Sequence, residues 1–395
     1  MKKVILKISS ALLIITLLLQ LFTVQNMEFV QAAKVQTVMM NRTKTTMLMG
    51  EGSFTASIDT ENCDINLKKL KSKWSIKSGK GIVKLTKKAD FSVEISALQV
   101  GTAVVEAKNK TGAYRCKITV IQGDDAEKEK VKEFIKEKFE CGLSSNLNSD
   151  SYEWNSKSGK LEGLNFSNCN EKSISLNTFG ELRNVNISGG AVADIDFSGN
   201  KRLKRLVISD VKNMSKVDLS SNKRMTSLDI YWSKIKKINI KQCVKLKRLS
   251  VLSTKLDSLD VSSNKELKTL IYESKGIKKI NLSNNSKIET LNLSGTNIRN
   301  LKLSKLINLK ELYLVDTNLK KLDVRRNKKV KIIRCNDNKK LKSIKFGKNA
   351  KLRTLDCSRT KIKSVNVKKC KRIEKIVCDK TVRVVGANKR CKIYR

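Results

Sequence analysis

A pattern of apolar residues returns every 21 residues over more than half of the chain, and it constrains the fold more than any other feature. Each unit begins with the spacing LxxLxL, as in Leu309, Leu312 and Leu314. The step is 21 residues at most places and 22 at two, and the units start at residues 161, 182, 203, 225, 246, 267, 288, 309, 330, 352 and 373. A short fixed period of this kind predicts a solenoid, in which each turn packs against the next.

The two halves of each unit predict two short extended segments. The LxL triplet alternates apolar and polar residues, which is typical of a strand with one buried face. The second half reads Leu319, then Leu322-Asp323-Val324, then Asn327, and this pattern also recurs. Asparagine stands at one equivalent position in six units, at residues 200, 222, 264, 285, 327 and 349. We expect these asparagines to be buried and to hydrogen-bond the main chain of the turns.

These units resemble leucine-rich repeats, most closely the 21-residue bacterial subtype of internalin-like surface proteins. The resemblance covers about residues 161–385 and rests on the LxxLxL spacing, the LDV triplets and the recurrent asparagine. The chain departs from that subtype where threonine replaces a frequent asparagine of the first half, at residues 254, 296, 317 and 360. The resemblance implies a mainly β fold, a solenoid of about eleven 21-residue turns, and a role in adhesion or recognition.

Residues 34–122 have a different texture, with alternating apolar and polar residues separated by Gly and Asn turns. This pattern predicts a β-sandwich, with Trp74 in its core. The region resembles the group 2 bacterial Ig-like domain through Leu48 and Gly50, the stretch KWSIKSGKGIVKL, the stretch VGTAVVEA and the final KITV. The resemblance implies a spacer or adhesion module.

Two further segments complete the predicted domain organisation. Residues 1–33 combine a charged start, an apolar core and small residues at their end, which is typical of a secretory signal peptide; an uncleaved anchor is the alternative. Residues 123–160 are predicted to form a linker helix and an N-terminal cap, with one apolar face made by Val131, Phe134, Ile135 and Phe139. The solenoid and its C-terminal cap then occupy residues 161–395.

The ten cysteines allow more than one interpretation. Cys335, Cys357 and Cys378 share one strand position in three consecutive units and are interpreted as a row of small buried side chains. Cys243 and Cys370 take the asparagine position and Cys169 a threonine position, so they are interpreted as substitutes within turns. Cys63 and Cys116 flank Trp74, and the spacing alone leaves open whether they form a disulfide.

The sequence offers little for catalysis. Histidine is absent, which excludes His-dependent nucleophile systems and His-ligated metals. No phosphate-binding loop, GxSxG or EF-hand motif is present. Asp218, Asp260 and Asp323 recur as part of the repeat and do not form a unique acid/base pair. We therefore expect no enzymatic activity, no cofactor and no metal.

Apolar and aromatic residues gather among the outward positions of the first strand. Residues between two inward side chains face outward. Clustered aromatic residues on such a face predict a partner site. The alternative is that Tyr231 and Trp232 cover an irregularity where a unit gains one residue. The predicted ligand-binding residues are Val207, Tyr231, Trp232, Leu252, Ile271, Tyr313 and Val315.

Basic residues also fall into columns. The chain has 83 Lys+Arg against 37 Asp+Glu, a formal net charge of +46. Like charges on adjacent strands repel, so their alignment predicts contact with an anionic polymer such as a cell-wall polymer or acidic glycan. Lysine-rich codon usage is the alternative, although it does not account for the shortage of glutamate. The predicted polyanion-binding residues are Lys236, Lys278, Arg299, Lys320, Lys342 and Lys363.

The predicted protein is thus secreted, extracellular or non-covalently associated with the cell wall. It recognises a host or envelope protein or glycan through the repeat sheet, and its basic faces attach to anionic polymers. We expect no specific nucleic-acid partner and no integral membrane segment. One alternative is a structural envelope protein held by charge without a discrete ligand, and another is an enzyme acting on wall glycans.

Overall fold

The computed structural model describes residues 37–41, 43–61, 71–89, 91–138 and 141–395. The predicted signal peptide and Cys63, and with Cys63 the question of a bond to Cys116, lie outside the described residues. The chain divides into two compact units: among the described residues, the first comprises 37–138 and 143–165, and the second 141–142 and 166–395. No helix in the described part of the chain is long and apolar enough to cross a membrane.

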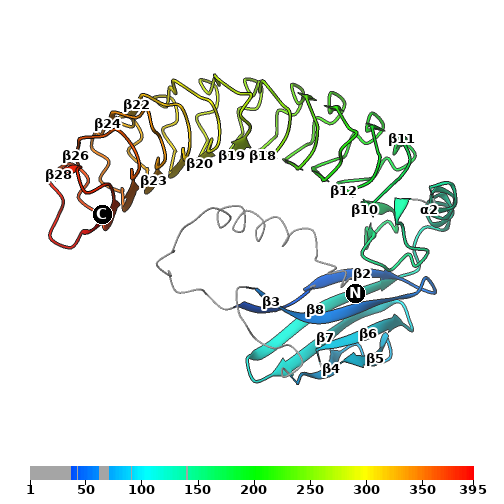
Figure 1. Cartoon of the computed structure of the whole chain (residues 1–395). Helices are drawn as coiled ribbons and strands as arrows, with labels where there is room; N and C mark the ends of the chain where they lie inside the picture. The colour runs from blue at the N-terminus through cyan, green and yellow to red at the C-terminus, as the bar shows by residue number, and fades with distance from the viewer. Residues whose placement is uncertain (1–36, 42, 62–70, 90, 139–140) are drawn as a thin grey trace, which may run out of the picture. The chain divides into compact units, whose positions relative to one another are not determined.

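The first unit contains two four-stranded sheets that share one hydrophobic core (Figure 1). Residues from both sheets contribute, including Ile58 and Ile95 from one and Val105 and Ile118 from the other. Trp74 packs against this core and remains partly exposed. The first sheet has the order β1 (Thr37–Met40), β3 (Ser53–Glu61), β6 (Ser92–Ala97), β5 (Val83–Ala89). The second has the order β2 (Lys44–Leu48), β8 (Gly112–Ile121), β7 (Gly101–Asn109), β4 (Lys73–Ser78).

Helix α2 (Asp125–Glu137) follows the sandwich and is the helix that the described residues form. It begins where the Asp124 carboxylate accepts a hydrogen bond from the backbone N–H of Glu127, which satisfies one of the free donors of the first turn. Val131 and Phe134 are buried, as their helical spacing predicts.

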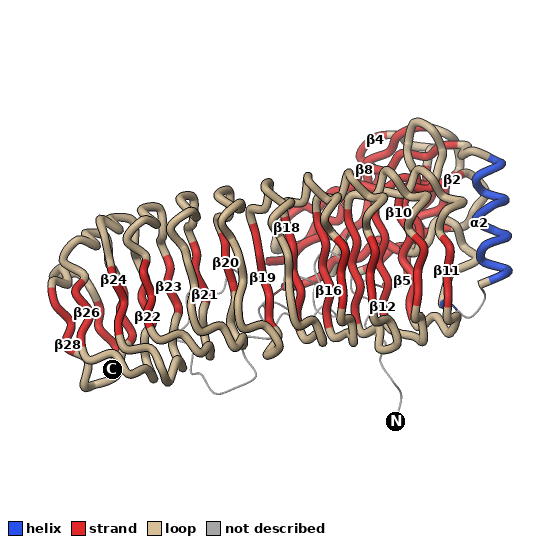
Figure 2. Tube along the Cα trace, turned by 90° about the horizontal axis from the view of Figure 1, so that it is seen from above, coloured by secondary structure: helices blue, strands red, loops and turns tan. Residues whose placement is uncertain are grey.

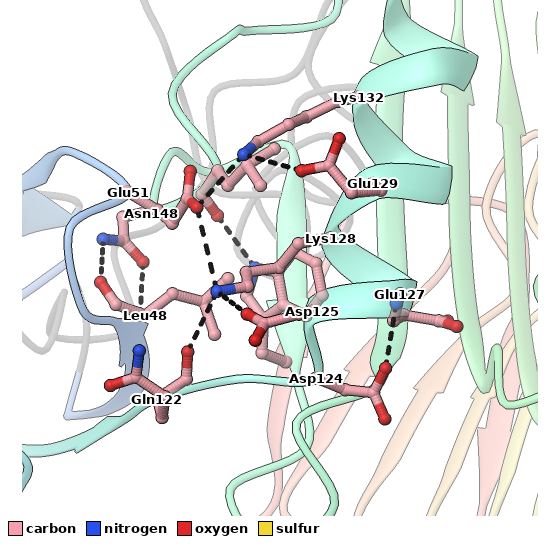
Figure 3. A network of polar contacts seen from close by, with 12 residues as sticks. Leu48, Glu51, Gln122, Asp124, Asp125, Glu127, Lys128, Glu129, Lys132 and Asn148 are labelled. Atoms are coloured by element: carbon pink, nitrogen blue, oxygen red, sulfur yellow. Dashed lines mark hydrogen bonds and ion pairs between the residues drawn. The ribbon is translucent and has the colours of Figure 1, made fainter.

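Polar contacts tie this helix and residues 143–165 to the sandwich within the first unit (Figure 3). The Lys128 ammonium donates to the carbonyl oxygen of Gln122 at 3.3 Å. The Asn148 amide donates to the carbonyl oxygen of Leu48 at 2.8 Å and accepts from its N–H at 2.6 Å. Because both groups of Leu48 are buried, this reciprocal pair satisfies a main-chain segment that would otherwise lack partners.

The repeats form a solenoid of about eleven turns, so the predicted fold class, mainly β with one short helix among the described residues, is confirmed. The first strands of the units make a single sheet in chain order, which Figure 2 shows from above. From β12 onward every neighbouring pair is parallel. The strands are β9 (Tyr152–Trp154), β10 (Leu161–Ser167), β12 (Asn184–Ser188), β14 (Arg205–Ser209), β16 (Ser227–Tyr231), β18 (Arg248–Leu252), β19 (Thr269–Glu273), β20 (Thr290–Asn292), β21 (Glu311–Tyr313), β23 (Ile332–Arg334), β25 (Thr354–Asp356), β27 (Lys375–Val377) and β29 (Lys392–Tyr394).

The second halves of the units form short paired strands on the opposite side of the solenoid. In Figure 1 the long sheet lines the inner side of the solenoid's arc and the short strands lie on its outer side. Between β17 and β22, the described turns have no such strand, although the repeat pattern predicts one in every unit. The short strands are β11 (Ser173–Ser175), β13 (Asp194–Asp196), β15 (Lys216–Asp218), β17 (Lys237–Asn239), β22 (Lys321–Asp323), β24 (Ser343–Lys345), β26 (Ser364–Asn366) and β28 (Arg383–Val385).

The two 22-residue steps gain their extra residue at the same place. Most turns have one residue with positive φ directly after the long-sheet strand position, for example Gly189 and Asp210. The segment from Asp210 to β15 is one residue longer than the segment from Gly189 to β13. The segment from Asp337 to β24 is likewise one residue longer than that from Asp316 to β22. The extra residue therefore leaves the long sheet in register.

The recurrent asparagines form the predicted ladder of buried side chains. Asn264, which is fully buried, donates from its amide to the carbonyl oxygens of Ile240 at 3.0 Å and Cys243 at 2.9 Å. Asn200, Asn222, Asn285, Asn327 and Asn349 make the same pair of bonds to the preceding turn. At the Cys243 position the Sγ atom lies 3.6 Å and 3.7 Å from the corresponding two carbonyl oxygens, which confirms its interpretation as a substitute.

The cysteines confirm one interpretation and correct another. Cys335, Cys357 and Cys378 are free and buried, and burial raises the pKa of Cys357 to about 12, which leaves it an unreactive thiol at neutral pH. Cys169, by contrast, is wrongly interpreted as a turn substitute, because it forms a disulfide with Cys141. The bond closes a loop of 28 residues at the start of the second unit.

Candidate functional site

The inner face of the long sheet carries two rows of outward-facing residues, and the register of the strands aligns them as the repeat predicts. The first row passes through Val207, Asp229, Ser250, Ile271, Asn292 and Tyr313. The second row passes through Ser209, Tyr231, Leu252 and Glu273. Tyr231 and Leu252 are direct neighbours on adjacent strands, and Ile271 lies on the strand after Leu252.

The predicted ligand-binding residues differ widely in exposure. Tyr231, Leu252 and Ile271 are buried, and Val207, Tyr313 and Val315 are half-buried. Trp232 is the large exposed side chain of the group, at 36%. Its ring lies 6.2 Å from that of Tyr231, centroid to centroid, and the two planes are inclined at 51°. The buried side chains of Tyr231, Leu252 and Ile271 therefore form a packed floor beside the exposed Trp232 indole. The half-buried residues Val207, Tyr313 and Val315 lie on other strands of the same sheet or directly after them.

A polar network holds this floor in place. The Asp229 carboxylate is almost fully buried and accepts hydrogen bonds from the Ser227 hydroxyl at 2.9 Å and the Tyr231 hydroxyl at 3.0 Å. It also pairs with the Arg248 guanidinium, with Nε 2.9 Å from Oδ1. Burial, and next the Asp229 charge, raise the pKa of Tyr231 well above its usual range, so it stays a neutral donor. The network holds the Tyr231 ring in place, and the Trp232 ring packs beside it.

Sequence patterns missed this network. Asp229 and Arg248 carry opposite charges on adjacent strands, where Arg248 faces Ser227, two residues before Asp229. A diagonal pair of this kind is within reach of long side chains across a sheet. The alignment of the strands places these two opposite charges near each other. The repeat also aligns many other charged residues, so nothing in the sequence distinguishes this pair.

The main chain at Trp232 is unusual for a large aromatic residue. Its φ is +47°, in the left-handed region; equivalent positions of other turns hold mostly small or short residues, such as Gly189, Asp210 and Ser253, and in one turn the large Arg359. A left-handed conformation costs a residue with a Cβ about 1–2 kcal/mol. The extra residue of the 22-residue turn lies between Asp210 and β15, well before Tyr231, so Trp232 does not compensate for it. An exposed indole kept at a strained position is typical of a binding surface.

The predicted polyanion-binding residues form the basic column, defined as Lys236, Lys278, Arg299, Lys320, Lys342 and Lys363. All six are exposed, and none forms an ion pair with the residues that the structure describes. Neighbouring positions differ, because Lys287 pairs with Glu266 at 2.6 Å and Lys310 with Glu289 at 2.6 Å. Lys320 and Lys342 directly precede paired short strands, so this part of the column borders the outer side of the solenoid.

The candidate residues thus fall into two regions. On the inner face, Tyr231 and Trp232 lie beside the hydrogen-bonded Asp229 and Arg248, and the basic column carries charges without ion-pair partners among the described residues. Groups of three or more His, Cys, Asp or Glu residues that could hold a metal ion are absent from the described residues.

Comparisons with known proteins returned solved structures only. No protein-family model and no curated protein matches the chain. The functional domain of InlJ from Listeria monocytogenes, which includes a cysteine ladder, is 21% identical over 59% of this chain, with a TM-score of 0.48. This chain covers 55% of that domain. An internalin, InlF, from the same species is 12% identical over 59% of this chain and 86% of its own, with a TM-score of 0.37. The leucine-rich repeat protein LIC12759 of Leptospira interrogans is 13% identical over 59% of this chain and 89% of its own, with a TM-score of 0.34.

Proposed function

We propose that the protein is an exported, non-enzymatic recognition protein that binds a protein or glycan through the inner face of its solenoid. The observation that carries this proposal is Trp232, which is exposed, aromatic and held at a left-handed main-chain position beside the Asp229 network. The strands that present it are rigid elements, which suits a preorganised site. Residues 34–122 act as an Ig-like spacer in this proposal, and residues 123–160 as the linker and cap.

Export and attachment complete the proposal. The signal-peptide pattern of residues 1–33 sends the chain out of the cell, and the Cys141–Cys169 disulfide suits an oxidising compartment. The basic column then retains the protein on anionic polymers of the envelope or on acidic glycans. The two regions have different roles in this proposal. The charge of the basic column retains the protein on the polymer, and the inner face selects the ligand.

Replacing Trp232 by glycine separates recognition from folding. Glycine adopts a positive φ without penalty. We therefore expect the free energy of unfolding of Trp232→Gly to equal that of the parent or to exceed it by about 1 kcal/mol. We expect capture of the ligand to fall at least tenfold, because aromatic anchors dominate the energy of binding surfaces. The measurement is binding of residues 34–395 to a glycan array and to purified envelope and host surface proteins, at high salt. Ile307→Ala, which shortens an exposed apolar side chain elsewhere on the solenoid, is the control. Equal capture by Trp232→Gly and the parent would contradict the proposal.

Neutralising the basic column is expected to remove salt-sensitive retention. With six phosphate-like contacts, affinity for a polyanion falls on the order of 10³-fold between 50 and 200 mM salt. A variant with all six residues of the column replaced by glutamine should bind heparin or purified teichoic acid weakly and lose most of this salt dependence. The control removes the same charge from the first unit, by changing Lys73, Lys84, Lys108, Lys110, Lys117 and Lys136 to glutamine. Equal losses in both variants would mean that net charge alone, and not the column, attracts the polymer.

A further inference from the structure

A pocket of about 340 Å³ opens on three consecutive turns of the second unit, near the ends of strands β18, β19 and β20. These strands follow one another along the solenoid in Figure 2. The pocket begins at Ser253, which stands one turn after Trp232 at the equivalent left-handed position. Its volume lies in the range of small-molecule sites.

A single core substitution explains why the pocket exists. Tyr272 takes an inward position that Val251 occupies in the neighbouring turn, and it is fully buried. Its hydroxyl donates to the carbonyl oxygen of Leu256 at 2.6 Å, and the Ser274 hydroxyl donates to the same oxygen at 3.1 Å.

The Leu256 carbonyl oxygen is therefore not used in the backbone hydrogen bonds that join successive turns. In the regular turns, a backbone N–H donates a hydrogen bond to the carbonyl oxygen of the residue 20 positions earlier. The N–H of Lys255 donates to Ile235 in this way, and that of Asn297 donates to Ile277. The equivalent N–H of Gly276 instead donates to the Ser274 hydroxyl at 3.3 Å. The main chains of these two turns are consequently not joined at this point, and the pocket lies there.

Two glycines keep the opening clear. A Cβ at residue 276 would lie 2.4 Å from Oδ1 of Asp257, and a Cβ at residue 295 would lie 2.9 Å from Cγ of Glu273. Both carboxylates line the pocket. Side chains at these two positions would push the acidic groups aside or fill the space between them.

The chemistry of the lining restricts the ligand. The walls carry carboxylates (Asp257, Glu273), ammonium groups (Lys255, Lys275) and hydroxyls (Ser253, Thr254), with no apolar side chain among the lining residues. The apolar part of the wall comes from carbon atoms of polar residues and glycines, and an inorganic anion would face two carboxylates as well as the two ammonium groups. The lining therefore supplies both donors and acceptors beside carbon surface, which matches a molecule that carries hydroxyl groups on a carbon ring.

Glu273 is the carboxylate of the pocket that a ligand hydroxyl would stabilise most. It is half-buried, and burial raises its pKa above the ordinary value, with the Lys275 charge acting in the opposite direction. Lys275 directs its ammonium group to Asp316, with Nζ 2.7 Å from Oδ2. A partly desolvated carboxylate gains from hydrogen bonds that a ligand hydroxyl supplies.

We propose that this pocket binds one uncharged sugar ring of a glycan, with Asp257 and Glu273 accepting hydrogen bonds from its hydroxyls. Trp232, one turn away, offers a π-face for the apolar C–H side of the same or the adjoining sugar. The inference deepens the proposed function and rests on it, because it assigns the ligand of the inner face to the glycans and identifies the subsite that reads a single residue.

The test uses residues 34–395 and free sugars at millimolar concentration: glucose, galactose, mannose, N-acetylglucosamine and N-acetylgalactosamine. Saturation-transfer NMR should show one or a few of them bound, and neither glycerol nor acetate. Two independent variants close the site: Gly276→Val fills the space beside Asp257, and Glu273→Ala removes the half-buried acceptor. We expect binding at least tenfold weaker in both. Glu266→Ala removes an exposed carboxylate outside the pocket and should bind as the parent does.

The outcomes separate this inference from the proposed function. Failure of all five sugars to bind, or binding that survives in both pocket variants, overturns the sugar pocket. If a protein is then still captured in a Trp232-dependent manner, the proposed function stands without the pocket. Sugar binding should also weaken as pH falls through the raised pKa of Glu273, because protonation removes the negative charge and turns one acceptor oxygen into a donor. A binding constant that stays flat from pH 7 to 4 counts against the assigned role.

Discussion

Replacing Asn264 by alanine is expected to destabilise the solenoid by about 2–4 kcal/mol. The side chain makes two hydrogen bonds to carbonyl oxygens of the preceding turn, at 3.0 Å and 2.9 Å, and it is fully buried. Alanine removes both donors and leaves the carbonyls of Ile240 and Cys243 without them in a region that excludes water. An unsatisfied buried polar group costs about 1–3 kcal/mol, which exceeds the net value of the bond itself. Urea unfolding followed by circular dichroism measures the loss.

An exposed asparagine of the same solenoid provides the matched control. Asn300 is exposed, and no hydrogen bond of its side chain is found among the described residues. Asn300→Ala should therefore change the free energy of unfolding by less than about 0.5 kcal/mol, as surface changes usually do. If Asn264→Ala costs no more than Asn300→Ala, the ladder does not stabilise the stack. The explanation for its regular recurrence would then lie in folding kinetics.

Removing the Cys141–Cys169 disulfide is expected to cost about 3–4 kcal/mol at 25 °C. The bond closes a loop of 28 residues, and the chain-entropy model gives this magnitude for a loop of that length. The bond lies at the first turn of the stack, and a crosslink there limits fraying from that end. Cys141→Ala/Cys169→Ala should lower the midpoint of urea unfolding, and protease cleavage near residue 169 should become faster.

Reductant supplies the control for this prediction. Adding dithiothreitol should lower the stability of the parent to that of the double variant and leave the double variant unchanged. A further loss in the reduced double variant would point to a second disulfide in the chain. An unchanged midpoint in both proteins would mean that Cys141 and Cys169 do not hold the end of the stack.

Much of the second unit follows from the repeat, and the reason is physical. Each turn contacts only its neighbours, so the phase of Leu309, Leu312 and Leu314 fixes which residues point inward and which form the outward rows. The asparagine ladder was predictable for the same reason, because a buried polar residue that recurs with the period needs a recurring partner. The place of Trp232 directly after Tyr231 predicts that the two rings are neighbours, and their centroids lie 6.2 Å apart, while its part in a binding face stays a prediction.

Features that break the repeat were not predictable. The partner of Cys169 lies outside the period, at Cys141, and no spacing rule identifies it. Tyr272 looks like one more inward residue, although its hydroxyl reaches Leu256 and opens the pocket. The burial of Tyr231 depends on the Asp229 and Arg248 network, which requires side-chain conformations as well as register. Local exceptions in a regular stack thus produce the candidate sites.

The two longer turns have a consequence for how such a chain can change during evolution. Both absorb their additional residue between the left-handed position and the short outer strand, and the inner rows continue undisturbed. Insertions at the edge of these two turns are therefore tolerated without shifting the outward rows of the inner face, whereas in the turn after Ser253 the same segment supplies Lys255 and Asp257 to the pocket. Lineages could lengthen or diversify these edge loops one turn at a time, and an engineer could graft a peptide there, while the recognition face keeps its alignment.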